Sequence, residues 1–179
     1  MASQGGSDPA AAHPAPNESK TPTAKPIIVE RLTHKDIPEI CALYKRVWEP
    51  VKTEIPADLL KSWTPAPLDF TSSMEGVTYF AARRDGKLIG AVGCETSDGA
   101  CRIVHLAVDI DQRRQGVATA LASAAIEWAR HNNSYSLWAD ALAKLETANH
   151  FFLHLGFVEC GILHRHQWNE DVRLFEKLL

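Results

Sequence analysis

The amino-acid sequence predicts a single α/β (α+β) domain, with a mixed, mostly antiparallel sheet of about six or seven strands flanked by about four helices. The chain has 179 residues, which is enough for one hydrophobic core and too few for two domains of ordinary size. Hydrophobic residues make up 45% of the chain and charged residues 23%, which is ordinary globular usage. Short β-like runs alternate with stretches of helical periodicity. These observations exclude a wholly disordered chain.

The N-terminal residues 1–26 differ in composition from the rest of the chain. They hold half of the ten prolines and many Ala, Ser and Gly residues, but no Val, Ile, Leu, Phe, Trp or Tyr. Because such a segment has nothing with which to build a core, a disordered Ala/Pro-rich tail is expected. The folded domain is expected over residues 27–179.

The domain is expected to begin with one strand and two helices. Residues 27–32 are rich in Ile, Val and Leu and predict a strand. Over residues 37–48 apolar side chains recur at helical spacing, and Thr33 followed by Asp36 is typical of a helix start. A second, short helix is predicted at residues 56–63.

Three β-like runs follow, at residues 77–82, 88–94 and 101–108. The turns between them contain Asp85-Gly86 and Asp98-Gly99, and Asp-Gly is a strong hairpin signal. The three runs therefore predict an antiparallel meander.

The second half of the chain begins with a polar, basic loop and continues as alternating helices and strands. A long helix rich in Ala and Leu follows the loop, and Gly156 marks the end of a later helix. The predicted elements are a helix at 117–131, a strand at 137–139, a helix at 145–155, and strands at 157–163 and 172–178.

Charge and hydropathy exclude two classes of partner. The net charge is -3 and the pI is near 6.2, so the basic surface that nucleic-acid binding needs is missing. No apolar run reaches the roughly 20 residues that span a bilayer, and the N-terminus has no apolar core of a secretory signal. No nucleic acid and no membrane partner is expected, and the sequence predicts a soluble, cytoplasmic protein.

No metal site is expected. The four cysteines are widely spread without a Cys-x-x-Cys pair, which indicates small buried hydrophobic residues. Glu146, His150 and His154 have a helical spacing that can present three ligands, but their order is not that of known zinc helices.

The most informative segment lies between the third strand of the meander and the long helix. A helix N-terminus carries unpaired N–H groups and a positive dipole end, so a small-residue loop leading into it can hold a diphosphate. Gly116 and Ala118 keep this loop small, and Arg113 and Arg114 add charge. The alternative is a solvated basic loop with an ordinary helix cap. Neither a Gly-x-Gly-x-x-Gly fingerprint nor a P-loop is present.

With its preceding strand and following helix, this loop resembles the acetyl-CoA site of the GNAT superfamily of acyl-CoA-dependent N-acetyltransferases. The family signature is [Arg/Gln]-x-x-Gly-x-[Gly/Ala], and Arg113, Gly116 and Ala118 fill its three defined positions. The element order over residues 27–179 resembles that family throughout. The resemblance implies a splayed pair of strands that holds acetyl-CoA as co-substrate, an amine-bearing acceptor (a small molecule, a protein N-terminus or a lysine), and a homodimer.

The resemblance also implies which residues contact the cofactor and how. In the strand, the N–H of Leu106 is expected to polarise the thioester carbonyl, and the neighbouring backbone is expected to pair with the pantetheine arm. The expected cofactor-binding residues are Leu106, Ala107, Val108, Arg113, Arg114, Gln115, Gly116, Val117, Ala118, Thr119, Asn149 and Phe152.

The chain departs from the family pattern at its usual general acid. Counting back from Gly156 puts Phe152 where many members have the Tyr that protonates the leaving thiolate. Asn149 lies on much the same helical face and is expected to supply the missing hydrogen bond to the cofactor. This departure leaves a second reading open, a non-catalytic acyl-CoA-binding module of the same fold. A third, a metal-binding or purely structural domain, rests on the eight histidines.

His105 is the titratable side chain in the predicted strand before the loop, and it is the candidate catalytic base. The alternative is a hydrogen-bonded histidine in the core, which is the more common state. Alternation places His105 on the face opposite Val104 and Leu106. Asp140 and Glu54 are weaker candidates, expected to be exposed carboxylates.

The acceptor is expected to be chosen by two loop regions, residues 49–67 and residues 161–171, because loops on a rigid scaffold usually carry specificity.

Overall fold

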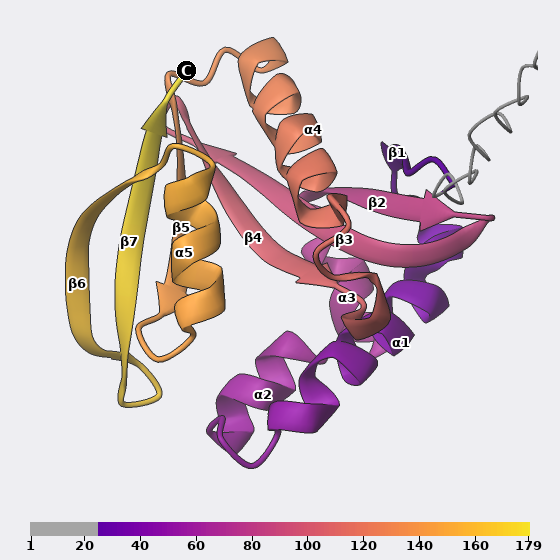
Figure 1. The fold of residues 1–179 in the computed structure, drawn as a ribbon, viewed down its shortest axis with the longest axis horizontal. Coiled ribbons are helices and arrows are strands. Elements are labelled where there is room, and N and C mark those ends of the chain that lie inside the picture. Colours follow the sequence, from indigo (N-terminus) through magenta and orange to yellow (C-terminus); the bar gives the residue numbers. More distant parts are fainter. Residues whose placement is uncertain (1–24) are drawn as a thin grey trace, which may run out of the picture.

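The computed structural model describes residues 25–179. The predicted tail therefore lies outside the described residues, apart from Lys25 and Pro26. A seven-stranded sheet forms the centre of the domain, in the order β1-β2-β3-β4-β5-β7-β6 (Figure 1). All neighbouring pairs are antiparallel except β4 and β5, which are parallel. The predicted single domain with a mixed, mostly antiparallel sheet is confirmed.

The first part of the chain contains one strand and three α-helices: β1 (Ile28–Arg31), α1 (Ile37–Trp48), α2 (Ala57–Trp63) and α3 (Pro67–Ser73). The sequence did not predict α3. It is a short helix with a proline in its first turn, and only Phe70 is buried, so no apolar periodicity marks it. The described residues thus hold one α-helix more than the four expected.

The predicted meander is confirmed as β2 (Thr78–Arg84), β3 (Lys87–Ser97) and β4 (Ala100–Val108). Asp85 and Gly86 in one turn, and Asp98 and Gly99 in the other, all have positive φ, between 54° and 80°. Two consecutive left-handed residues make a turn whose twist matches the paired strands, which explains both Asp-Gly signals.

The second part contains α4 (Val117–His131), β5 (Ser136–Leu142), α5 (Glu146–His154), β6 (Val158–Gln167) and β7 (Glu170–Leu178). The bounds of α4 are those predicted. The strand β5 is longer than predicted because its whole length pairs with β7, from Ser136 opposite Leu178 to Leu142 opposite Val172.

The helices cover both faces of the sheet (Figure 1). On one face α1 and α3 pack with Tyr79 of β2 and Leu88 of β3. On the other face α4 packs on the meander, and Phe152 of α5 joins the same cluster. A third cluster joins α2 to the ends of β5 and β7. The site described below lies between these clusters, at β4.

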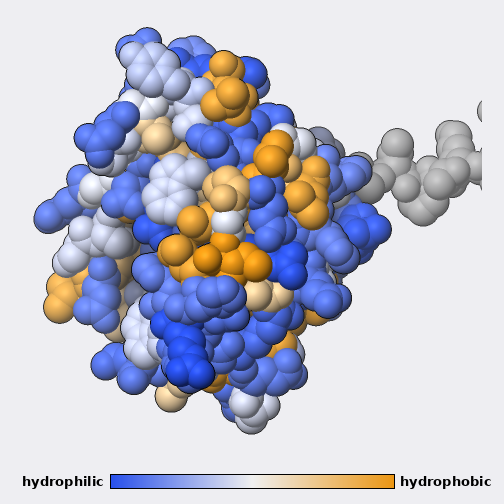
Figure 2. All heavy atoms as spheres, turned by 90° about the vertical axis from the view of Figure 1, so that its left-hand side faces the viewer, coloured by the Kyte–Doolittle hydropathy of each residue, from blue (hydrophilic) through white to orange (hydrophobic). Residues whose placement is uncertain are grey.

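The sheet ends at β6, which has a neighbour on one side only. Seen from this side, the surface is largely hydrophilic, with separate apolar patches (Figure 2). Exposed apolar side chains of β6 include Val158, Ile162 and Leu163. Cys160 of β6 is exposed, which corrects the expectation that all four cysteines are buried; Cys41, Cys94 and Cys101 are buried. Across residues 25–179, every helix is too short or too polar to cross a bilayer.

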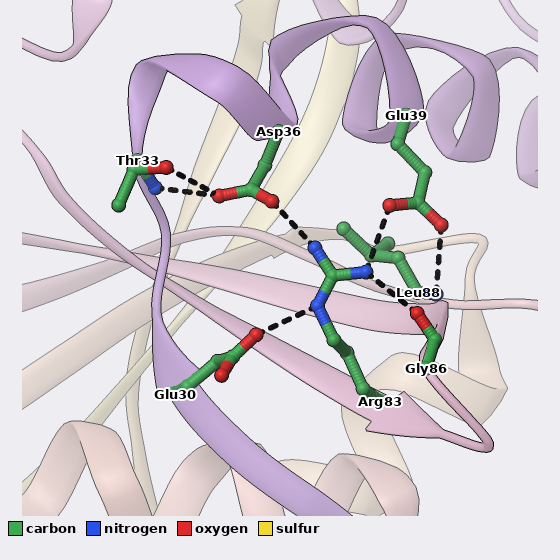
Figure 3. Close-up of polar contacts among 7 residues, drawn as sticks. All are labelled: Glu30, Thr33, Asp36, Glu39, Arg83, Gly86 and Leu88. Carbon is green, nitrogen blue, oxygen red and sulfur yellow. Dashed lines mark hydrogen bonds and ion pairs between the residues drawn. The ribbon is translucent and has the colours of Figure 1, made fainter.

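A cluster around Arg83 joins β1, the start of α1 and the β2–β3 turn (Figure 3). The guanidinium, only 15% exposed, donates to Glu30 at 2.7 Å, to Glu39 at 2.8 Å and to Asp36, and also to the carbonyl oxygen of Gly86. Asp36 in turn accepts from the backbone and hydroxyl of Thr33, which caps the first helical turn. The predicted helix start at Thr33 and Asp36 is thereby tied to the sheet.

The Arg83 cluster lowers the pKa of two carboxyl groups. Partial burial acts to raise the pKa of Asp36 and of Glu39, but hydrogen bonds outweigh it, from Thr33 and Arg83 at Asp36 and from Arg83 and the N–H of Leu88 at Glu39. A lowered folded-state pKa stabilises the fold above the unfolded-state pKa, and this stabilisation is lost as pH falls through the folded-state value.

We expect Arg83→Met to lower the free energy of unfolding by about 2 kcal/mol at pH 7, because charged groups that are partly buried lose their partner. The difference from wild type should shrink as pH falls through the lowered pKa values of Asp36 and Glu39, because both carboxyls then become protonated. Urea denaturation at a series of pH values from 7 downward measures this difference. Arg31→Met, which removes an exposed cation from the neighbouring strand β1, is the control. Equal losses in the two variants would contradict the role of the cluster.

Candidate active site

The strands β4 and β5 are paired over only part of their length. The parallel pairing runs from Ala100 opposite Ser136 to Ile103 opposite Ala139 and then ends. Beyond it, β4 continues to pair with β3 as far as Val108, and β5 continues to pair with β7 as far as Leu142. The two strands diverge here (Figure 1). The predicted splayed pair is confirmed, and it leaves one edge of β4 without a strand beside it after Ile103.

A β-bulge lies in β4 just beyond the last pair with β5. Val104 is opposite Gly93 and Ala107 is opposite Ala91, so His105 and Leu106 together face one residue of β3, Val92. His105 has a φ of 52°, in the left-handed region that L-residues rarely adopt. An extra residue with left-handed backbone is typical of a bulge that redirects a side chain.

The bulge reverses the alternation of side chains along β4. Cys101 and Ile103 belong to the cluster under α4, and after the bulge Leu106 and Val108 pack against that same cluster. His105 instead contacts Tyr44 and Tyr79, which belong to the cluster under α1. The expectation that His105 lies opposite Val104 is therefore wrong, because strict alternation does not hold through a bulge. His105 is also exposed rather than buried in the core.

Two buried tyrosines hold His105 in this conformation. The hydroxyl of Tyr44 donates to the carbonyl oxygen of His105 at 3.0 Å, and the hydroxyl of Tyr79 lies 2.8 Å from Nδ1 of its ring. The Tyr79 and His105 rings are parallel within 4°. These contacts offset the cost of the left-handed backbone, roughly 1–2 kcal/mol. Close by, Gly93 leaves room for the ring of Tyr79, since a Cβ there would lie 2.9 Å from it.

The pKa of His105 is lowered. Desolvation in the concave site is the main cause, and the positive charge of Arg102 acts in the same direction, whereas Asp140 and Glu95 oppose it. His105 is therefore neutral at pH 7, with a lone pair on one ring nitrogen. This is the protonation state that a general base requires.

His105 lies in a pocket of about 550 Å³. Both loop regions that the sequence predicts to choose the acceptor contribute to this pocket, the first through α2 and its flanking residues and the second through the β6–β7 turn. The lining residues are Asp58, Lys61, Ser62, Pro65, Asp69, Ser73, His105 and Trp168. The helix α3, which the sequence did not predict, supplies two of them, Asp69 and Ser73.

The two alternative bases are less suited to the task. Arg102 holds Oδ1 of Asp140 at 2.7 Å and Gln167 donates to Oδ2 at 2.8 Å, so both carboxylate oxygens are occupied. Only 14% of the Asp140 side chain is exposed, which corrects the expectation of a free surface carboxylate. Glu54 is exposed as expected, but it does not line the His105 pocket.

The loop before α4 presents free backbone N–H groups. Arg113 donates its N–H to Ile110 at 3.3 Å, but from Arg114 to Thr119 no backbone N–H donates to an acceptor within residues 25–179. The helix begins at Val117, and its N-cap residue, Gly116, supplies no side-chain cap. Gly116 has a φ of 80°, and a Cβ there would meet nothing within 4 Å. These features fit an anion cradle rather than an ordinary capped helix start.

The side chains of the loop and of the first turn of α4 differ in exposure and in their hydrogen bonds. Arg113 and Arg114 are exposed, and Arg113 Nε donates to the carbonyl of Val108. Gln115 accepts from Arg84 and donates to the carbonyl of Asp111, which ties the loop to β2. The remaining predicted cofactor residues differ in burial: Val117 is buried, Ala118 is half-buried and Thr119 is exposed.

Asn149 and Phe152 are both buried in α5. Asn149 is 3% exposed, and its Nδ2 donates to the carbonyls of Leu142 and Ala143, while its Oδ1 has no partner in the described part of the chain. Phe152 is 5% exposed and packs against Phe157 and Phe175. Its ring is part of the core, so binding of the cofactor by Phe152 and Asn149 stays a prediction.

The histidine-rich face of α5 does not assemble a metal site. Glu146, His150 and His154 are all exposed. Nowhere in residues 25–179 do three His, Cys, Asp or Glu side chains come together closely enough to hold a metal ion.

The chain belongs to the GNAT acetyltransferase family, because the profile of the "Acetyltransferase (GNAT) family" matches residues 37–157. Searched by sequence, the curated proteins contain no significant match. Solved structures with the same fold include the ribosomal-protein-S18-alanine N-acetyltransferase from Escherichia coli, with 20% identity, a TM-score of 0.70, and 85% of this chain and 93% of that chain covered. The PaiA N-acetyltransferase from Thermoplasma acidophilum, in complex with coenzyme A, has 13% identity, a TM-score of 0.71, and coverage of 86% and 99%.

We expect an NMR titration to give His105 a pKa below the ordinary value near 6.5. Arg102→Gln should raise this pKa, because it removes the cation that lowers it and frees the charge of Asp140. In the wild type, the lowered pKa means that the folded protein binds fewer protons at His105 than the unfolded chain does. The contribution of His105 to stability is therefore present above about pH 6.5 and is lost as pH falls through the lowered pKa. Arg130→Gln, at an exposed position of α4, is the control. A His105 pKa unchanged by Arg102→Gln would contradict the assignment.

Proposed function

We propose that this protein is an acetyl-CoA-dependent N-acetyltransferase that acetylates a primary amine by direct attack in a ternary complex. The observation that carries the proposal is the position of His105. It faces a pocket that is open to an acceptor, and it lies two residues beyond the point where β4 and β5 part. The acceptor class is a small-molecule amine, a protein N-terminus or a lysine, and the cytoplasm is the proposed location.

The residues along β4 and the following loop would hold acetyl-CoA. The free N–H groups from Arg114 to Thr119 suit the diphosphate, and Arg113 and Arg114 add positive charge beside it. The edge of β4 that lacks a strand after Ile103 offers its backbone to the pantetheine amides. The N–H of Leu106, in the bulge, is assigned to the thioester carbonyl, where a hydrogen bond stabilises the developing negative charge.

His105 would act as the general base. Neutral at pH 7, it takes a proton from the ammonium group of the acceptor, and the neutral amine then attacks the thioester carbon. A C–N bond forms and the C–S bond breaks. The attacking nitrogen gives up its second proton, which passes through water to the departing thiolate, since Phe152 replaces the usual acid. The pocket is lined by two carboxylates, Asp58 and Asp69, and by one cation, Lys61, and this excess of negative charge favours a cationic acceptor over an anionic one.

A second function remains a candidate because of Phe152. A non-catalytic acyl-CoA-binding module would keep the cradle and lack a general acid, and the burial of Phe152 in the core is consistent with that loss. Thiol release from acetyl-CoA across a panel of amines distinguishes the two. Tight coenzyme A binding with no turnover on any amine would favour the module.

We expect coenzyme A to raise the melting temperature of the wild type, by an amount that corresponds to about 2.7 kcal/mol at 100 times Kd. Gly116→Val should abolish this shift. A valine Cβ at a φ of 80° is strained and would project into the open space beside the free amides. Gly76→Val, where a Cβ also meets nothing and φ is not positive, is the control. An unchanged thermal shift in Gly116→Val would contradict the proposed binding of the diphosphate by this loop.

We expect His105→Gln to lower kcat by about 10²–10⁴-fold while leaving the coenzyme A thermal shift intact, because the base is lost and the cradle is not. In the wild type, activity should fall as pH drops through the lowered pKa of His105, since the base becomes protonated. His150→Gln, at an exposed histidine outside the pocket, should have wild-type activity. Full activity in His105→Gln would remove His105 from the mechanism.

A further inference from the structure

A chain of hydrogen bonds runs from the backbone of α3 to the ring of His105. The hydroxyl of Ser73 donates to the carbonyl oxygen of Phe70 at 2.7 Å. The same Ser73 oxygen lies 3.3 Å from the hydroxyl of Tyr79, and the Tyr79 hydroxyl lies 2.8 Å from Nδ1 of His105. The chain therefore joins the last turn of α3, the strand β2 and the bulge of β4.

The carbonyl oxygen at the α3 end of this chain decides the direction of every hydrogen bond in it. A carbonyl oxygen can only accept, so Ser73 uses its single proton on Phe70. The contact between Ser73 and Tyr79 is then a hydrogen bond only if Tyr79 donates its proton to Ser73. The Tyr79 oxygen is thereby left to accept at its other contact. The ring of His105 must supply that proton, from Nδ1.

We propose that the chain formed by Phe70, Ser73 and Tyr79 holds His105 in the tautomer that carries its proton on Nδ1. Nε2, the other ring nitrogen, has no hydrogen-bond partner within the described residues, so it keeps its lone pair for the pocket. Ser73 and Tyr79 are positioning residues for His105. The assignment of Nε2 as the atom that takes the acceptor's proton rests on the proposed function, whereas the tautomer does not.

Burial keeps the hydrogen-bonded tyrosine in the state that the chain requires. Tyr79 is 1% exposed, and burial raises the pKa of its phenol, so it retains a proton to donate to Ser73. The charged groups around His105 are Arg102, Glu95 and Asp140 from the sheet, and Asp58, Lys61 and Asp69 from the pocket. None of these side chains is a hydrogen-bond partner of the ring, so within residues 25–179 Tyr79 alone selects the tautomer.

The tautomer can be measured on the full chain by two-bond ¹H–¹⁵N NMR of its histidines at pH 8, without acetyl-CoA or an acceptor. The His105 signals are assigned by their loss in His105→Gln. We expect the pattern of a neutral imidazole with its proton on Nδ1. A wild-type spectrum with the proton on Nε2 would overturn the proposal, since Tyr79 would then be donating to Nδ1. This result is independent of turnover, so failure of the proposed function would leave it intact.

Two matched variants at Ser73 test the direction of the chain. Ser73→Ala removes the acceptor of the Tyr79 proton, so Tyr79 should turn and donate to Nδ1, which moves the His105 proton to Nε2. Ser73→Thr keeps the hydroxyl and should keep the wild-type tautomer. If Ser73→Ala keeps its proton on Nδ1, the hydrogen-bond chain does not select the tautomer. This result would overturn the proposal even if the wild-type protein carries its proton on Nδ1.

The same variants have a kinetic consequence if the proposed function holds. Ser73→Ala should lower kcat about tenfold, the equivalent of one ordinary hydrogen bond, while KM for acetyl-CoA stays within twofold. Ser73→Thr should restore kcat. Tyr79→Phe, which leaves Nδ1 without a partner, should lower kcat to a similar extent and give a mixture of tautomers. A loss of kcat in Ser73→Ala with an unchanged tautomer would show a structural role and overturn the proposal.

Discussion

The bulge in β4 is the constraint on which the rest of the site depends. It places His105 and Leu106 opposite Val92 alone and puts His105 in a left-handed backbone conformation. A regular strand would turn the His105 side chain toward α4, away from the pocket. Tyr44 and Tyr79, both buried, provide the hydrogen bonds that stabilise the unusual backbone and orient the ring. Backbone strain of this kind is typical of functional sites, where the surrounding structure holds it in place.

The strand β4 contributes to both proposed binding sites, the one for acetyl-CoA and the one for the acceptor amine. After Ile103, β4 has β3 on one edge and no strand on the other, so its backbone is available to a ligand. The loop that follows the strand presents free N–H groups, while the bulge turns His105 to the opposite side. Because the open edge and the bulge lie on one rigid strand, and the loop with the free N–H groups follows that strand directly, the three features are close together in the chain. Such an arrangement suits a reaction that proceeds mainly by bringing two substrates together.

Most of the fold could be predicted because the signals that specify it are local. The Asp-Gly turns of the meander, the apolar periodicity of α1 and α4, and the loop through Gly116 all depend on neighbouring residues. The helix α3 could not be predicted in the same way, since only Phe70 in its two turns is buried. Asp140 was expected to be an exposed carboxylate, but it forms an ion pair with Arg102. This ion pair joins β5 to β4, and which strands become neighbours is decided by the assembly of the sheet and not by local sequence.

The sequence by itself determined the order of elements, the family resemblance and His105 as the candidate base, because residue type and spacing along the chain carry that information. Only the tertiary structure decided where His105 points and which ring nitrogen is free. Those outcomes depend on Ser73, Tyr44 and Tyr79, which all lie between 26 and 61 residues from His105 in the chain. Hydroxyl groups that meet across elements leave no periodic pattern in the sequence, since their pairing depends on how the elements pack.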